Sequence, residues 1–225
     1  MNLWTAEIFA LLLLEAPAPR RFDPDTTSDL LAIAQVLKKH IVRIEVTLAT
    51  RPNSLQDETR DGFGVAINPN TVVALSHLVE NAGEIRILGP TKYAIEARVV
   101  VYDPPVAALE VLEPLTKVGT VPAKFVSHGS VNIDDPVFAL TDIDPLAGTI
   151  TGVISFVDPT EPDHLKTSLK LAHGMPIFDR EARLLGYSRT LVWDPDPFLV
   201  VSTEAIEKAL AKGRALSQKH RNHGR

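Results

Sequence analysis

The sequence contains no cysteine, so disulfide bonds, zinc–thiolate sites and a cysteine nucleophile are excluded. No apolar run reaches the roughly 18 residues that a membrane-spanning helix needs, and no transmembrane helix is expected. Glycine (12) and proline (17) occur without a fixed period, which excludes a collagen-like chain. Basic residues are fewer than acidic ones, 23 against 28. This balance argues against nucleic acid as a partner, because phosphate binding needs clustered lysine and arginine.

The chain has the composition of a globular protein. Of its 225 residues, 45% are hydrophobic and 23% are charged, which is unlike a disordered chain. This length permits one domain with two lobes or two small domains. A core of this size is stable without disulfide bonds.

The two ends of the chain differ from its middle. The apolar run Ile8–Leu14 precedes Ala16–Ala18 (APA), which resembles the cleavage site of a secretory signal, although Glu7 and the lack of a preceding Lys or Arg are atypical. Residues 1–27 are therefore interpreted as a leader or signal segment, which favours a periplasmic or secreted protein. The alternative is an amphipathic N-terminal helix in a cytoplasmic protein. Residues 203–225 are expected to form a closing helix and a basic tail.

Between the ends, the hydrophobic pattern changes from helical to alternating. Ser28–His40 carries its apolar residues at helical spacing. From Ile41 onward, short apolar runs recur between turn signals such as Asn68–Asn70 and Asp179–Glu181, and these runs predict strands. The expected strands are Ile41–Leu48, Phe63–Ile67, Thr71–Leu75, Glu84–Leu88, Ala94–Val101, Leu109–Leu112, Val137–Leu140, Thr149–Val157, Leu184–Trp193 and Phe198–Val201. Many short strands with close turns predict an all-β sandwich or barrel.

An internal similarity indicates two lobes. Gly64 and Gly174 each precede an apolar strand, a polar turn and a second apolar strand. The predicted organisation is a helix plus first lobe over residues 28–118 and a second lobe over residues 119–202.

Three segments resemble motifs of one protease family. They are Asp61–Leu88 (DGFGVAINPNTVVALSHLVENAGEIRIL), Asp103–Leu112 (DPPVAALEVL) and His173–Asp179 (HGMPIFD). Together they resemble trypsin-like serine proteases of the high-temperature-requirement, or Deg-type, family over roughly residues 28–215. The resemblance implies two six-stranded antiparallel β-barrels with an N-terminal helix and a C-terminal helix. Because the sequence ends soon after the last predicted helix, the peptide-binding PDZ module that often follows in this family is not expected.

The same resemblance assigns the catalytic positions, and two of the three are changed. His77 matches the catalytic histidine. The acid position is Ala108, or Ala107 if a one-residue gap is moved, and the nucleophile position is His173 instead of serine. The loop that forms the oxyanion hole in the family reads Leu171, Ala172 and His173 here, with Leu171 in place of its first glycine.

A serine protease needs a hydroxyl activated by a histidine whose tautomer is held by a carboxylate. This chain lacks both partners of His77. The sequence therefore predicts a catalytically inactive pseudoprotease that binds a peptide or protein partner, through the cleft between the lobes or by adding a strand to a sheet edge.

Two alternatives remain open from the sequence. The first is a serine-type hydrolase with an atypical site, in which Ser168 is the nucleophile or Asp103 or Asp179 replaces the missing acid. The second is a cleft in which His77 and His173 bind Zn²⁺ or another divalent transition metal, since neutral imidazole is a common ligand of such metals. His128, His164 and Asp103 are candidates for the remaining ligands of that metal.

Overall fold

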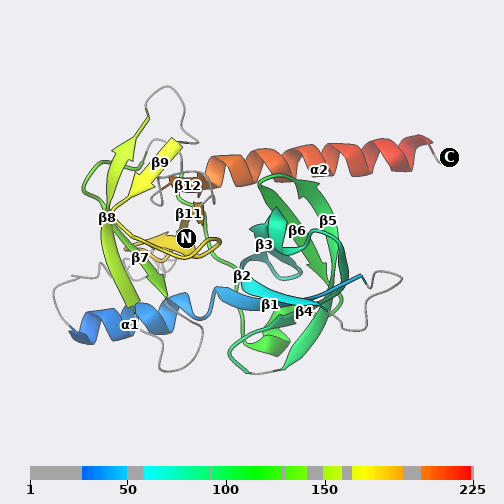
Figure 1. Cartoon of the computed structure of the whole chain (residues 1–225), viewed down its shortest axis with the longest axis horizontal. Coiled ribbons are helices and arrows are strands. Elements are labelled where there is room, and N and C mark those ends of the chain that lie inside the picture. Colours follow the sequence, from blue (N-terminus) through cyan, green and yellow to red (C-terminus); the bar gives the residue numbers. More distant parts are fainter. Residues whose placement is uncertain are drawn as a thin grey trace, which may run out of the picture.

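The computed structural model describes residues 27–49, 58–91, 93–127, 130–140, 149–158, 164–189 and 199–223 (Figure 1). The predicted leader, apart from its last residue Thr27, lies outside the described residues. From residue 214 onward only the helical backbone of the last element is described. Within the part of the chain described, no helix is long and apolar enough to cross a membrane.

The first half of the chain forms a closed antiparallel barrel. Its strands are β1 (Ile41–Leu48), β2 (Thr59–Asn68), β3 (Thr71–Leu75), β4 (Ala82–Leu88), β5 (Ala94–Asp103) and β6 (Val106–Val111). They follow one another around the barrel in the order β1-β2-β3-β6-β5-β4. Alternation explains the barrel interior: Ile44 and Val46 of β1 are buried, whereas Arg43 and Glu45 between them are partly exposed.

The second half forms another closed antiparallel barrel, which lies beside the first (Figure 1). Its strands are β7 (Pro136–Leu140), β8 (Thr149–Val157), β9 (His164–Thr167), β10 (Pro176–Asp179), β11 (Leu184–Arg189) and β12 (Leu199–Ser202). The order around the barrel is β10-β11-β12-β9-β8-β7. The predicted pair of six-stranded antiparallel barrels is therefore confirmed, and it is consistent with a trypsin-like fold.

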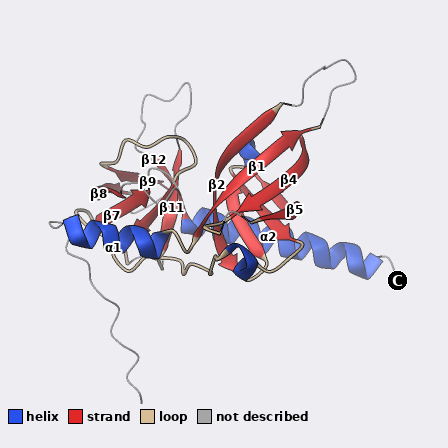
Figure 2. Cartoon of the chain, turned by 90° about the horizontal axis from the view of Figure 1, so that it is seen from below, coloured by secondary structure: helices blue, strands red, loops and turns tan. Residues whose placement is uncertain are grey.

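Two helices connect the barrels across their boundary (Figures 1 and 2). Helix α1 (Thr27–Leu37) precedes the first barrel but packs against β8 of the second, where Thr149 Oγ1 donates to the carbonyl of Leu30 at 3.0 Å. Helix α2 (Thr203–His223) follows the second barrel and packs against β5 and β6 of the first. It is longer than the Thr203–Leu216 helix that the sequence predicts.

The buried apolar residues form three clusters. One fills the first barrel, around Ile87 and Leu109, and another fills the second, around Ile154 and Ile177. The third lies between the barrels and under both helices, and it includes Tyr187. The third cluster therefore fixes the position of one barrel relative to the other, and with it the distance between side chains that face each other across the boundary.

Candidate functional site

His77 lies in a 3₁₀ turn, η1 (Ser76–Leu78), that follows β3. The turn is fixed from two sides: Ser76 N donates to the carbonyl of Pro105 at 2.8 Å, and Arg60 Nη1 donates to the carbonyls of His77 at 3.1 Å and Glu80 at 3.3 Å. Carbonyls at the end of a short helix have no N–H partner within the helix, and the guanidinium of Arg60 supplies the missing donors. The backbone that carries His77 is therefore held while its side chain is exposed.

His173 lies in the loop between β9 and β10, and Ser188 of β11 holds that loop. Ser188 Oγ donates to the carbonyl of Ala172 at 2.5 Å and accepts from Met175 N at 3.0 Å. The carbonyl of Ser188 accepts from Gly174 N at 2.9 Å. The residues on both sides of His173 are thus bound to one buried serine.

Gly174 gives this loop its turn. Its φ is +83°, a backbone conformation that strains any residue with a Cβ. A Cβ built on Gly174 would lie 3.8 Å from His77 Cε1, so the loop of the second barrel comes close to the imidazole of the first.

The two histidines are hydrogen-bonded to each other across the boundary between the barrels. His173 Nε2 lies 3.1 Å from His77 Nδ1, and the ring centroids are 4.2 Å apart with the planes inclined at 54°. One nitrogen must donate its N–H and the other must accept, so the two facing nitrogens share one proton. The structure therefore brings together the two histidines that the sequence singled out.

Burial and a nearby arginine both disfavour the protonated form of each imidazole. Partial burial, the neighbouring His173 and the Arg60 guanidinium lower the pKa of His77 to about 4. Burial and the Arg189 guanidinium lower the pKa of His173 below its ordinary value. Both rings are therefore mostly neutral near pH 7, and among the described residues no carboxylate is a cause of either shift.

The candidate acid position offers no carboxylate to the pair. Ala108 in β6 stands opposite Val73, and its methyl group belongs to the apolar cluster between the barrels. Ala107 points into the first barrel instead. In an intact triad the acid binds histidine Nδ1–H. Here the Nδ1 of His77 faces His173.

The other candidate acids are engaged elsewhere. Asp103, at the end of β5, pairs with Lys212 of α2 at 2.5 Å. Asp179 pairs with Arg183 at 2.6 Å, in the predicted hairpin turn between β10 and β11. Neither carboxylate is positioned to hold the tautomer of a histidine in the pair.

Ser168 is also occupied. Its Oγ accepts from Val153 N at 2.9 Å, and its own N donates to the carbonyl of Val153 at 2.8 Å. It is therefore bound to β8 and does not take the role of a shifted nucleophile in this structure.

The candidate oxyanion loop is divided between the core and the surface. Leu171 is buried in the cluster that fills the second barrel, whereas Ala172 is exposed and His173 is half-buried. The large apolar side chain of Leu171 therefore anchors the start of the loop.

The described residues contain no group of three or more His, Asp or Glu side chains that could hold a metal ion. Of the further ligands considered from the sequence, His128 lies outside the described residues, and the side chain of His164 is not described. Asp103 is paired with Lys212. Among the described residues, the candidate metal site therefore offers two ligands, the imidazoles of His77 and His173.

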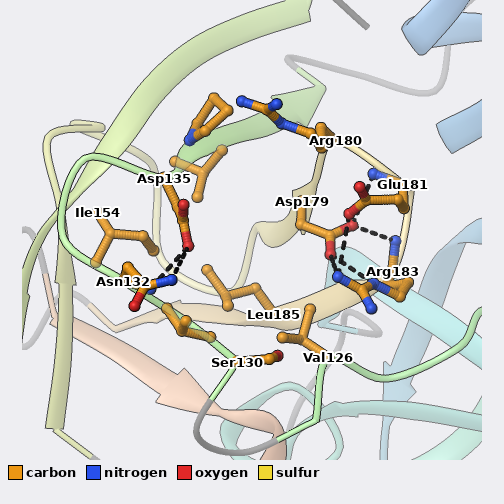
Figure 3. Close-up of a pocket in the computed structure, with 13 residues that line it drawn as sticks. Val126, Ser130, Asn132, Asp135, Ile154, Asp179, Arg180, Glu181, Arg183 and Leu185 are labelled. Atoms are coloured by element: carbon orange, nitrogen blue, oxygen red, sulfur yellow. Dashed lines mark hydrogen bonds and ion pairs between the residues drawn. The ribbon is translucent and has the colours of Figure 1, made fainter. Parts of the chain in front are cut away.

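A separate pocket of about 260 Å³ is lined by residues of the second barrel and includes neither histidine of the pair (Figure 3). Asp135 accepts from the backbone N–H of Asn132 at 2.7 Å on one side, and Asp179 is paired with Arg183 on another. Arg180 also lines this pocket. Glu181, the third carboxylate of the pocket, is also paired with Arg183, so all three of its carboxylates have partners.

Sequence reasoning missed three residues that shape the site. Arg60 caps the turn of His77, Ser188 holds the loop of His173, and Arg189 adds charge beside that loop. None belongs to a motif, and each acts on a residue at least 16 positions away in the sequence.

Comparison with known proteins adds no relative: no protein-family model matches this chain, and no curated protein matches it. Any assignment of function to the histidine pair therefore depends on the residues and the geometry described above.

Proposed function

We propose that this chain is a pseudoprotease of the trypsin-like type, similar to the Deg-type family, that has lost peptide hydrolysis and binds a peptide or protein segment where the barrels meet. The observation that carries the proposal is the hydrogen bond between His77 and His173. An imidazole occupies the position of the attacking hydroxyl, and it also engages the nitrogen that the triad acid would hold.

The loss of hydrolysis follows from the chemistry of the pair. Acyl transfer needs a nucleophile, a base that removes its proton, and a group that fixes the base. His77 supplies an imidazole, but its lowered pKa makes it a weak base, its ring partner is His173, and Ala108 supplies no carboxylate. Neither the nucleophile nor the fixing group is present in the described site.

Peptide binding does not depend on those groups. The register between β10 and β11 ends at Pro176 and Tyr187, and Ser188 continues it with backbone bonds to Gly174 and Met175. The loop that carries His173 is therefore held firmly beside the exposed His77, and an extended peptide can bind there through main-chain hydrogen bonds. The exposed Ala172 and His77 flank the place where such a segment would lie.

A fluorophosphonate probe and casein hydrolysis test the loss of catalysis. We expect no labelling and no turnover by the wild type. His173→Ser is the matched variant, because it places a hydroxyl where His77 can activate it, and we expect it to react with the probe more than the wild type does. Labelling of the wild type that disappears in His77→Ala would overturn the proposal.

Binding is tested with a pool of end-blocked random decapeptides, by mass spectrometry of the retained peptides. We expect retention by the wild type and loss in Ala172→Tyr, whose bulk would cover the site without adding charge. Retention that is equal in both proteins would place the binding elsewhere and contradict the proposal.

A second candidate function, a transition-metal site, is favoured by the spacing of the pair. With metal–nitrogen bonds of about 2.05 Å, two nitrogens 3.1 Å apart subtend about 98° at the metal. That angle lies between square-planar and tetrahedral values and suits Cu²⁺, Ni²⁺ or Zn²⁺. However, Arg60 and Arg189 both oppose a cation here, and the donor set has only two members, so peptide binding is the preferred proposal.

Calorimetry with Ni²⁺ or Zn²⁺ tests the second candidate. A metal bound by both rings requires that His77→Ala and His173→Ala each abolish the heat of binding. Equal affinity in the wild type and His173→Ala would remove the paired-histidine site.

A further inference from the structure

The charge around the histidine pair is unbalanced. The guanidinium of Arg60 is held close to His77, because it donates to the carbonyls of His77 and Glu80 in the turn that carries this histidine. Arg189 is on the same face of β11 as Tyr187, whose hydroxyl donates to the carbonyl of Val73 in β3, the strand that leads into the turn of His77. One arginine thus lies near each of the two imidazoles, where the barrels meet.

Two described acidic groups close in the sequence to these arginines or to the loop of His173 are paired elsewhere. Asp61, beside Arg60, is paired with Arg43 at 2.7 Å. Asp179 is paired with Arg183. In contrast, the backbone of Arg189 pairs with Leu199 of β12, and its guanidinium has neither a hydrogen bond nor an ion pair with another residue that the structure describes.

We infer that the partner is held through a carboxylate, which the Arg189 guanidinium and an imidazole N–H of the His77–His173 pair receive together. This inference rests on the proposed function, since it names the chemistry of the segment that binds there. The planar guanidinium matches a carboxylate with two parallel N–H donors. The lowered pKa of both imidazoles has burial as its main cause, and among the described residues the charges that add to it are positive.

The carboxylate of the partner would supply the negative charge that the triad acid supplies in a serine protease. In a serine protease the acid of the triad supports the histidine from within the same chain. Here Ala108 leaves that role empty, and the arginines make the surface near the histidines attractive to an anion. A partner that brings its own acid therefore has an advantage over a neutral one.

Four pools of decapeptides with blocked N-termini test this inference, with EDTA present to remove metals. Nine positions are random among uncharged residues, and the fifth is fixed. Three pools have amidated C-termini and carry Glu, Gln or Lys at that position. The fourth carries Gln but has a free C-terminal carboxylate, which separates the two sources of the acid.

We expect the wild type to retain the Glu pool, the free-carboxylate pool or both about tenfold better than the amidated Gln pool, the size of one charge-assisted hydrogen bond. Arg189→Gln should reduce that preference to within about twofold, whereas Arg189→Lys should keep part of it. Arg180→Gln is the matched control, because it removes one half-buried arginine from the same barrel, away from the histidines. Thermal melts confirm that each variant is folded.

The outcomes separate the two proposals. Equal retention of all pools, or preference for Lys, overturns the carboxylate inference and leaves peptide binding in place. A preference that Arg189→Gln and Arg180→Gln weaken equally also overturns it, because net charge alone would then explain the result. If no pool binds, the proposed function fails and the carboxylate inference fails with it.

Discussion

The hydroxyl of Tyr187 forms a hydrogen bond between the two barrels, and its removal should lower the free energy of unfolding. Tyr187 in β11 is fully buried and donates to the carbonyl of Val73 in β3 at 2.6 Å. Burial raises the pKa of its phenol, so the group remains a donor at any ordinary pH. Tyr187→Phe keeps the ring and leaves a buried carbonyl without this donor. Such a loss costs about 1–3 kcal/mol in the free energy of unfolding.

Urea unfolding measures this cost, and for a chain of this size each kcal/mol also lowers the thermal midpoint by about 2–4 °C. Tyr93→Phe is the control, because Tyr93 is 49% exposed and its hydroxyl lies 3.4 Å from Glu113. We expect that control to change stability by less than about 0.5 kcal/mol. Equal losses in the two variants, or no loss in Tyr187→Phe, would refute the reasoning.

Three further predictions concern the candidate site. Ser188→Ala removes the hydroxyl that holds the loop, so the imidazole NMR signals of His173 should shift while the far-ultraviolet circular dichroism stays unchanged; unshifted signals would mean that the loop holds itself. Gly174→Ala should cost about 1–2 kcal/mol in urea unfolding, because φ is +83° although the added Cβ has room; an unchanged midpoint would contradict this. The pKa of His77 is about 4 in the folded protein against an ordinary 6.5, so the unfolded chain binds more protons between these values. Stability is then fully present above about pH 6.5 and falls as the pH drops toward about 4. His77→Gln should flatten this dependence of the unfolding midpoint, and an identical slope in both proteins would count against the assignment.

The barrels could be predicted because their signals are local. The alternation of buried and exposed residues in Ile41–Leu48 identifies a half-buried strand without knowledge of its neighbours. Asn68–Asn70 and Asp179–Glu181 form the predicted turns, since Asn68 Oδ1 accepts from Asn70 N and Asp179 Oδ1 accepts from Glu181 N. The end of the last helix was misjudged, because its final turns lack the apolar periodicity used to find helices.

The surroundings of the histidines could not be predicted in the same way. The pairing of His77 with His173 followed only from a resemblance that placed both at one site. The roles of Arg60, Ser188 and Arg189 depend on side chains that meet through tertiary packing. A lone arginine or serine in a strand has no pattern that would show which distant backbone it contacts.

Alanine at position 108 suits the hydrogen bond between His77 and His173. Its methyl group is 1% exposed, in an apolar cluster that also holds Leu75 and Val106. A carboxylate there would need a partner, because an unpaired buried charge is strongly unfavourable. The triad partner would be the Nδ1–H of His77, but that nitrogen already faces His173. Once an imidazole stands at position 173, an acid at position 108 has nothing to bind. Alanine at position 108 and histidine at position 173 are thus physically compatible with each other and with the apolar cluster between the barrels.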